Sequence, residues 1–217
     1  MPTASRSVLA FGIVAALTCA VPRAVDAQPR ESIGRLVLDL RGSFVPFGRN
    51  AEFAELRGFA GPQTPGLGLG FEAGAHVYVF RWKAITFGLG GSVHSSAANQ
   101  RPGERSPDPD GPSIRKRFTA FASQLSFNFG GRNGWSYISG GLGPSRLLLH
   151  SVDTKAPMAR SSNTLNYGGG ARWFNSEHLA FSIDLRFYAI SPLQQMDDDP
   201  GSPRMTIMVL SIGASFK

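Results

Sequence analysis

The sequence predicts an all-β fold: an eight-stranded antiparallel up-and-down transmembrane β-barrel that follows a cleaved N-terminal signal peptide. Three observations predict it. Eight segments alternate apolar with small or polar residues, which is the two-residue period of a β-strand. The connections between these segments alternate long and short. The 217 residues include 26 Gly and 16 Phe but only 17% charged residues, and each Gly costs a helix about 1 kcal/mol relative to Ala.

The N-terminal segment has the features of a secretory signal peptide. Arg6 precedes an almost unbroken apolar run from Val8 to Ala20, and Val25-Asp26-Ala27 is a small-residue cleavage site. The apolar run is shorter than the ~20 residues of a membrane helix. We therefore expect residues 1–27 to be removed on export and residues 28–217 to form the barrel.

Cys19 offers an alternative, because a lipidated cysteine would make the protein a lipoprotein. The preceding Ala16-Leu17-Thr18 argues against it, since there is no Leu three positions before the cysteine. Cleavage after Ala27 removes this only cysteine, so we expect no disulfide and no thiolate metal site. It also removes two Arg and one Asp, which lowers the net charge from +7 to +6. In an exported chain this charge favours phosphorylated lipid over nucleic acid as the anionic partner.

The first two strands are expected at residues 34–45 and 67–80. Pro46 ends the first, because Pro cannot donate to a strand ladder, and a long polar segment, 47–66, follows. The second alternates for longer than a soluble strand of ~5–6 residues needs, and it suits the ~9–11 residues of a tilted membrane strand. The apolar faces of these strands are Leu36, Leu38 and Leu40, then Leu67, Leu69, Phe71, Ala73, Ala75, Val77 and Val79.

The third, fourth and fifth strands are expected at residues 84–94, 118–129 and 135–147. A long loop rich in Ser, Pro, Asp and Arg, 95–116, precedes the fourth strand, and a glycine-rich hairpin turn follows it. The fifth strand is less regular, and Pro144 predicts a bulge or another irregularity there. The outward residues are expected to be Ile85, Phe87, Leu89, Val93, Phe121, Leu125, Phe127, Phe129, Ile138 and Leu142.

The last three strands are expected at residues 163–174, 179–190 and 205–217. Their outward residues are Leu165, Tyr167, Ala171, Trp173, Leu179, Phe181, Ile183, Leu185, Phe187, Leu210, Ile212, Ala214 and Phe216. Three apolar residues fall on the lumen side of the final strand. They are Met205, Ile207 and Val209. We therefore expect either an apolar outer half of the lumen or a strand end that has risen above the membrane.

The rhythm of the connections gives three short inner turns and four long outer loops, as a barrel with both ends in the periplasm requires. Trp82, Trp135 and Trp173 lie in or beside the short turns and predict a periplasmic aromatic girdle. A lipocalin-like barrel is the soluble alternative. In such a barrel the apolar face of each strand would point inward to a ligand, and the opposite face would lie in water. That opposite face is rich in Gly and carries few charges here, whereas a strand face in water usually carries more Lys and Glu.

From Asn166 to Phe174, and again at Arg186-Phe187-Tyr188, the chain resembles the small eight-stranded outer-membrane barrel proteins of the OmpA/OmpX type. Phe216 adds to the resemblance, because such barrels end in an aromatic residue that addresses them to the barrel assembly machinery; here Lys217 follows it. The resemblance implies residence in the bacterial outer membrane, among its lipids and lipopolysaccharide. We expect a monomer with a structural or surface-interaction role, no catalytic activity and no cofactor.

The inward face of the strands carries a set of polar residues that we expect to form a lumen network. Its members are Asp39, Arg41, Glu72, His76, Tyr78, Gln124, Asn128, Asn166, Arg172, Asp184, Arg186 and Tyr188. The interior of an eight-stranded barrel is just wide enough for side chains to fill it, and unpaired buried charge is costly. We therefore expect a packed plug of paired charges. The alternative is a narrow small-solute channel.

His94 and Ser96 have the His-x-Ser spacing of lipid A deacylases, which are outer-membrane barrels that act on their lipid-facing surface. A lipid-modifying enzyme is therefore the catalytic alternative. Strand parity argues against it, because it directs both residues into the lumen or to the strand end. Ala97 also stands where that family has Asn.

Two charged segments carry weaker interpretations. Asp197-Asp198-Asp199 could offer oxygen ligands to Ca²⁺, but three adjacent acids do not converge unaided, so we expect a solvated loop and no metal site. Arg115-Lys116-Arg117 could contact lipid phosphates. Positive residues that flank a strand at the level of the lipid head groups explain that segment equally well.

Overall fold

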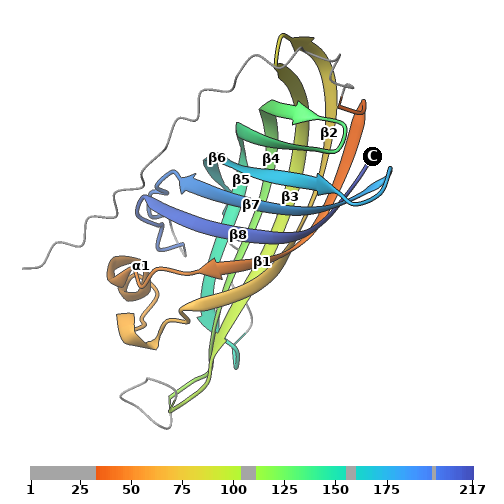
Figure 1. Ribbon diagram of the computed structural model, residues 1–217. Helices are drawn as coiled ribbons and strands as arrows, with labels where there is room; N and C mark the ends of the chain where they lie inside the picture. Colours follow the sequence, from red (N-terminus) through yellow and green to blue (C-terminus); the bar gives the residue numbers. More distant parts are fainter. Residues whose placement is uncertain (1–32, 104–110, 155–159, 197–198) are drawn as a thin grey trace, which may run out of the picture. The chain divides into compact units, whose positions relative to one another are not determined.

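The computed structural model describes residues 33–103, 111–154, 160–196 and 199–217, and the expected signal peptide lies outside them. The described chain forms a closed antiparallel ring in the order β1 to β8 (Figure 1). The strands are β1 Leu36–Pro46, β2 Leu67–Trp82, β3 Ile85–Gln100, β4 Ile114–Gly131, β5 Gly134–Ser151, β6 Ser162–Phe174, β7 Leu179–Ile190 and β8 Met205–Phe216. This confirms the predicted eight-stranded barrel. Within the described ranges no helix is long and apolar enough to cross a membrane.

The ring closes between the first and last strands. Leu38 lies opposite Phe216 at one end of this seam, and Phe44 lies opposite Leu210 at the other. In hydrocarbon an unpaired backbone N–H or C=O group costs several kcal/mol, so a sheet that meets lipid must leave no free edge there. Pairing between β1 and β8 meets that requirement.

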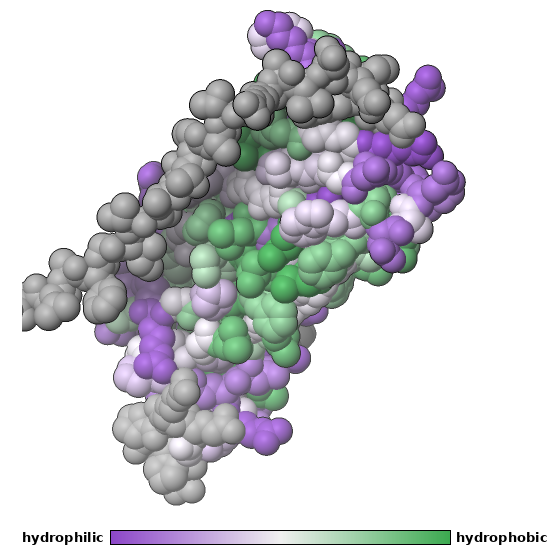
Figure 2. Space-filling model, in the orientation of Figure 1, coloured by the Kyte–Doolittle hydropathy of each residue, from purple (hydrophilic) through white to green (hydrophobic). Residues whose placement is uncertain are grey.

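Large apolar side chains cover the outward face of the strands. They include Leu38, Leu40, Leu69, Val77, Leu89, Phe121, Leu125, Ile138, Leu142, Leu165, Phe181, Leu185 and Ile212. Figure 2 shows hydrophobic residues across the middle of the visible face and hydrophilic residues towards its ends. Soluble monomers rarely expose so wide an apolar surface, whereas a lipid-facing band of this kind is typical of membrane barrels. The lipocalin-like alternative is wrong, because it requires this apolar set to line the lumen.

Three strands extend further at the outer end than the sequence predicted. The β3–β4 register continues to Gln100 opposite Ile114, and the β4–β5 register continues to Ile114 opposite Ser151. The alternation of buried with less buried residues persists along the outer ends of β3 and β4. The expected loop at 95–116 is therefore too long, because strand pairing occupies both of its ends.

The first outer loop contains helical structure that the sequence analysis did not predict. It includes α1, Ala51–Glu55, and a 3₁₀ turn at Gly61–Gln63. Asn50 caps α1, because its side-chain oxygen accepts a hydrogen bond from the Phe53 N–H at 2.9 Å. Phe53 is 1% exposed and belongs to a buried cluster with Ile114 of β4. The loop therefore packs against the outer end of the lumen.

The expected irregularity at Pro144 is present. The β4–β5 register runs up to Ser123 opposite Leu142 and resumes at Ala120 opposite Ser145, so the pairing is interrupted at the proline. Pro has no backbone N–H to donate, which is why strands bend or bulge around it.

Candidate functional site

The lumen contains the predicted polar network. Every one of its predicted members is at most 9% exposed, which places all of them inside the barrel. They are Asp39, Arg41, Glu72, His76, Tyr78, Gln124, Asn128, Asn166, Arg172, Asp184, Arg186 and Tyr188. They come from β1, β2, β4, β6 and β7, because the two-residue period turns alternate side chains of each strand inward.

Asp39 of β1 is the most heavily bonded carboxylate of this network. Its Oδ2 lies 2.6 Å from Arg172 Nη2, and its Oδ1 lies 2.7 Å from Arg41 Nη2. Ser215 of β8 donates to Oδ1, and His76 Nδ1 lies 3.4 Å from Oδ2. This one side chain therefore ties β1 to strands on both sides of it and across the lumen.

Glu72 and Asp184 form a second charged group beside the first. Arg41 donates to Glu72 Oε1 at 3.0 Å, so this arginine bridges the two groups. Arg186 Nη2 lies 3.0 Å from Asp184 Oδ2, and the Tyr137 hydroxyl donates to the same oxygen at 2.6 Å. Three guanidinium groups thus face three carboxylates, and the plug formed by these residues is electrically neutral.

Neutral side chains continue the network beyond the charges. His76 Nε2 and Gln124 Oε1 lie 3.0 Å apart, and Gln124 Nε2 donates to Ser92 Oγ at 2.9 Å. Asn128 Nδ2 donates to the Thr86 carbonyl oxygen at 3.1 Å. Because bonded polar groups from opposite walls meet, the inner lumen is a packed polar core, which the bore of an eight-stranded barrel allows.

The aromatic residues near the inner turns divide between the two faces. Trp82 and Trp173 are 56% and 53% exposed on the outer surface, where a girdle would lie. Trp135 departs from the prediction, because its ring is 3% exposed and packs inside the barrel against Tyr78 and Phe174. Trp135 and Tyr137 lie two residues apart on β5, so their side chains point to the same, inward face. The prediction relied only on the nearness of Trp135 to the turn, which does not determine the face.

The end of β8 lies on the lipid-facing side. Phe216 is 44% exposed and pairs with Leu38 of β1 and Leu179 of β7. Its ring is thus available on the outer surface at the inner end of the closing seam.

Apolar side chains form two buried clusters in the outer half of the lumen. Val209 and Ile207 of β8 are 0% and 6% exposed and pack in one cluster with Phe118, Tyr188 and Ile190. Met205 packs against the neighbouring cluster that contains Phe53. For the lumen side of β8 we expected either an apolar outer lumen or a strand end above the membrane, and the buried position of these residues agrees with the first.

His94 and Ser96 lie within this outer lumen. Each is 3% exposed, and His94 Nε2 lies 3.1 Å from Ser96 Oγ. The imidazole ring packs near the rings of Phe118 and Tyr188. The pair therefore faces the interior, and the outward neighbour Val93 occupies the surface that would meet lipid.

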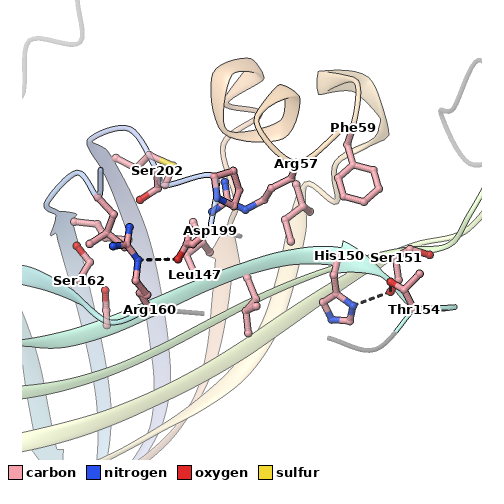
Figure 3. Close-up of a pocket in the computed structure, with 17 residues that line it drawn as sticks. Arg57, Phe59, Leu147, His150, Ser151, Thr154, Arg160, Ser162, Asp199 and Ser202 are labelled. Carbon is pink, nitrogen blue, oxygen red and sulfur yellow. Dashed lines mark hydrogen bonds and ion pairs between the residues drawn. The ribbon is translucent and has the colours of Figure 1, made fainter. Parts of the chain in front are cut away.

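A pocket of about 410 Å³ lies above the apolar lumen, between the outer ends of β5 and β6 and the first and fourth outer loops (Figure 3). Its apolar lining includes Phe59, Leu147, Leu149, Ile190, Leu193, Pro200 and Met205. Its polar rim includes Arg57, Ser145, His150, Thr154, Arg160, Ser162, Asp199 and Ser202. Two of these residues were singled out from the sequence, Met205 on the lumen side of the final strand and Asp199 in the acidic run, and neither was predicted to line a pocket.

The fourth outer loop is held by an ion pair at the pocket rim. Arg160 Nε lies 2.8 Å from Asp199 Oδ2, and Figure 3 shows the two side chains facing each other. Burial alone would raise the pKa of Asp199, but the Gly201 N–H and Arg160 donate to its carboxylate and lower the pKa below its usual value. Asp199 is therefore committed to Arg160, and Asp197 and Asp198 lie outside the described residues. No group of acidic, His or Cys residues within the described ranges could hold a metal ion.

The basic segment of β4 divides by parity. Arg115 and Arg117 are exposed on the outer face, at the level of the outer loops. Lys116 is 3% exposed, points inward and donates to the Gly48 carbonyl oxygen at 3.1 Å. A lipid contact by all three residues is therefore wrong, because strand alternation turns the middle one away from lipid.

Comparison with known proteins gives similarity of fold only. No protein-family model and no curated protein matches the sequence. Neisserial surface protein A (NspA) matches with 10% identity over 84% of this chain and 96% of that one, with a TM-score of 0.54. The attachment invasion locus protein Ail of Yersinia pestis matches with 17% identity over 86% and 98%, with a TM-score of 0.44. The N-terminal barrel domain of Pseudomonas aeruginosa OprF matches with 10% identity over 86% and 98%, with a TM-score of 0.43. The chain therefore has the fold of the small eight-stranded outer-membrane β-barrel proteins that its sequence resembles.

Proposed function

We propose that this chain is an exported, monomeric, integral outer-membrane protein with a structural and surface-interaction role and no catalytic activity. The observation that carries the proposal is the pairing of an apolar outer belt with a neutral, hydrogen-bonded plug inside a closed ring. The belt suits lipid, and the plug braces the wall from within. What remains free to interact is the outer loop surface, including Arg115 and Arg117, which suit the phosphates of lipopolysaccharide.

The plug supports a closed barrel over a small-solute channel. The carboxylates of Asp39 and Asp184 are 0% exposed, and Arg172 of β6 reaches across the lumen to Asp39 of β1. Ion permeation would require these pairs to separate in a region of low dielectric constant, which is costly. Planar-bilayer recording of the refolded chain should show no discrete conductance steps. Steps of uniform size would contradict the structural role.

The interior position of His94 and Ser96 supports a non-catalytic role over lipid hydrolysis. A lipid acyl ester would have to reach a pair that is 3% exposed and faces away from the bilayer. Incubation of the barrel with lipid A should release no acyl chain. Release that the change His94→Ala abolishes would instead establish the enzymatic alternative.

The proposed orientation can be tested on intact cells. Trypsin added outside should cut in the outer loops, for example after Arg49, which is exposed in the first outer loop between β1 and β2. It should spare Lys83, which lies in the short β2–β3 turn on the opposite end of the barrel. Cutting after Lys83 in sealed cells would contradict the inner position of the short turns.

A further inference from the structure

The pocket lies at the outer end of the barrel, beside the point where the pairing of β5 with β6 ends. β5 pairs with β6 only as far as Ser145 opposite Ser162. In the described part of the chain, the β6-facing edge of residues 147–151 has no strand partner, although β4 still pairs with their other edge. Leu147 and Leu148, which point to opposite faces of β5, both line the pocket. Within the described residues, the pocket therefore extends along the outer end of β5 past the last β5–β6 pair.

The lining suits an apolar molecule of modest size. Leu149 and Ile190 are 2% and 3% exposed, and Leu147, Phe59 and Met205 pack against the same buried clusters. This surface is continuous with the apolar outer lumen below it. A volume of about 410 Å³ falls at the lower end of the ~300–1,000 Å³ of small-molecule sites. It fits a single alkyl or aryl chain better than a two-chain lipid.

Arg57 places a positive charge at the pocket rim, and its side chain is fixed there by three contacts. Its guanidinium carbon lies 3.8 Å from the centre of the Phe53 ring, and it donates to the carbonyl oxygens of Phe53 at 3.2 Å and Gly201 at 2.8 Å. These bonds use two of the five N–H donors of a guanidinium. Figure 3 shows the side chain reaching across the top of the pocket towards the fourth loop.

Arg57 differs from Arg160, the other arginine at the pocket rim, in that no carboxylate of the described residues forms an ion pair with it. Arg160 pairs with Asp199, whereas Arg57 makes no ion pair among the described residues. Burial lowers the pKa of Arg57 from its usual value, and the Asp199 charge offsets part of that effect. Among the residues that the structure describes, the rim therefore carries one unpaired cation over an apolar floor.

We propose that this pocket binds a monomeric anionic amphiphile, a single apolar chain with a carboxylate head that Arg57 receives. The chain lies on Leu147, Leu149, Ile190 and Met205, and the carboxylate accepts hydrogen bonds from the donors of Arg57 that point away from the loop carbonyls. Charge complementarity selects the head, because an apolar floor alone would take an alcohol as readily as an acid. The proposal adds a ligand-binding site at the outer end of the barrel and goes beyond the structural role proposed above.

The test uses the full chain in phosphatidylcholine nanodiscs and equilibrium dialysis against radiolabelled decanoate and 1-decanol, with empty nanodiscs subtracted. Decanoate should bind saturably at one site per barrel. Arg57→Gln should weaken decanoate binding at least about tenfold, since it removes the hydrogen bonds from a charged donor to the carboxylate, and it should leave decanol binding unchanged. Arg49→Gln is the matched control, because Arg49 is exposed in the same loop and does not line the pocket. Leu147→Trp should fill the pocket and remove the binding of both ligands.

Three results would overturn the assignment. One is the absence of saturable binding above empty nanodiscs, and another is an equal effect of Arg57→Gln on decanoate and decanol. The third is a two-chain phospholipid retained in the purified protein, seen by mass spectrometry, with no decanoate uptake. Each variant is first checked for a heat-modifiable gel band. A variant that lacks the band has lost the barrel itself, which distinguishes failure of the fold and proposed role from failure of the ligand site.

Discussion

Asp39 concentrates more charged contacts than any other carboxylate in the described lumen. Arg41, Arg172 and His76 all lie within 4 Å of its oxygens, and its side chain is fully buried. Removing one member of a buried ion group leaves the remaining charges without compensation, which costs more than the net contribution of the intact group. The plug should therefore be most sensitive at this residue.

Asp39→Ala should destabilise the barrel by roughly 3–5 kcal/mol, because it leaves Arg172 without a carboxylate partner. Urea unfolding in lipid vesicles, followed by Trp fluorescence, measures the change. Glu177→Ala is the matched control, since Glu177 pairs with Arg132 at an exposed site and such pairs contribute about 0–1 kcal/mol. Equal effects of the two changes would contradict a plug that supports the barrel.

Asp199 gives a pH-dependent prediction at the outer rim. Because hydrogen bonds from Gly201 and Arg160 lower its pKa in the folded protein, its contribution to the order of the fourth loop is present above the usual pKa. That contribution is lost as the pH falls through the lowered folded value. The Gly201 amide resonance should titrate with a midpoint below 3.8, the usual value for Asp. A midpoint at or above 3.8 would show that these bonds do not form, and Asp199→Asn should abolish the titration.

At the scale of elements, the two-residue alternation determines most of this structure. The strands were predictable because each keeps one apolar face over its length, as at Leu67–Val79 in β2. α1 was not, because five residues are too few to show a helical period. The plug residues were predictable by parity, but their partners were not. That Arg172 meets Asp39 depends on which strands face each other across the closed ring.

The lipid-facing face of β4 can be tested by charge insertion at two depths. Leu125→Arg, near the middle of the outward belt, should destabilise the barrel by about 2–4 kcal/mol. Phe129→Arg, four residues nearer the inner turn on the same face, should cost about 0–1 kcal/mol, because its charge can reach the interface. Vesicle unfolding measures both. Equal costs at the two positions would contradict a membrane-embedded belt on this strand.

At the scale of the molecule, the closed ring and the pocket at its outer end both require pairing between β1 and β8. The pocket was the part least accessible from sequence, because residues from the first and fourth loops and the ends of β5 and β6 meet only after the ring has closed. The close approach of β1 and β8 at the seam also explains why residue 213 is a glycine. A Cβ there would overlap the Leu40 carbonyl oxygen and the Arg41 Cα of the paired strand.

Gly213→Val should therefore disrupt the seam and reduce the yield of closed barrel. Gly140→Val is the matched control, because a Cβ at Gly140 would meet only the Asn166 carbonyl oxygen, at an ordinary 3.6 Å. The yield of compact barrel after refolding into detergent micelles, measured on unheated gels, compares the two variants. Normal yield for Gly213→Val would argue against the tight β1–β8 approach.

The most direct test of the central claim, a closed barrel that spans a membrane, is the gel mobility of the refolded full chain in SDS with and without boiling. A closed barrel keeps its backbone hydrogen bonds paired around the ring and resists SDS until it is heated. The refolded chain should give a faster-migrating band before boiling, and boiling should shift that band to the unfolded position. A single band at the unfolded position under both conditions, from protein refolded in lipid or detergent, would contradict a closed barrel.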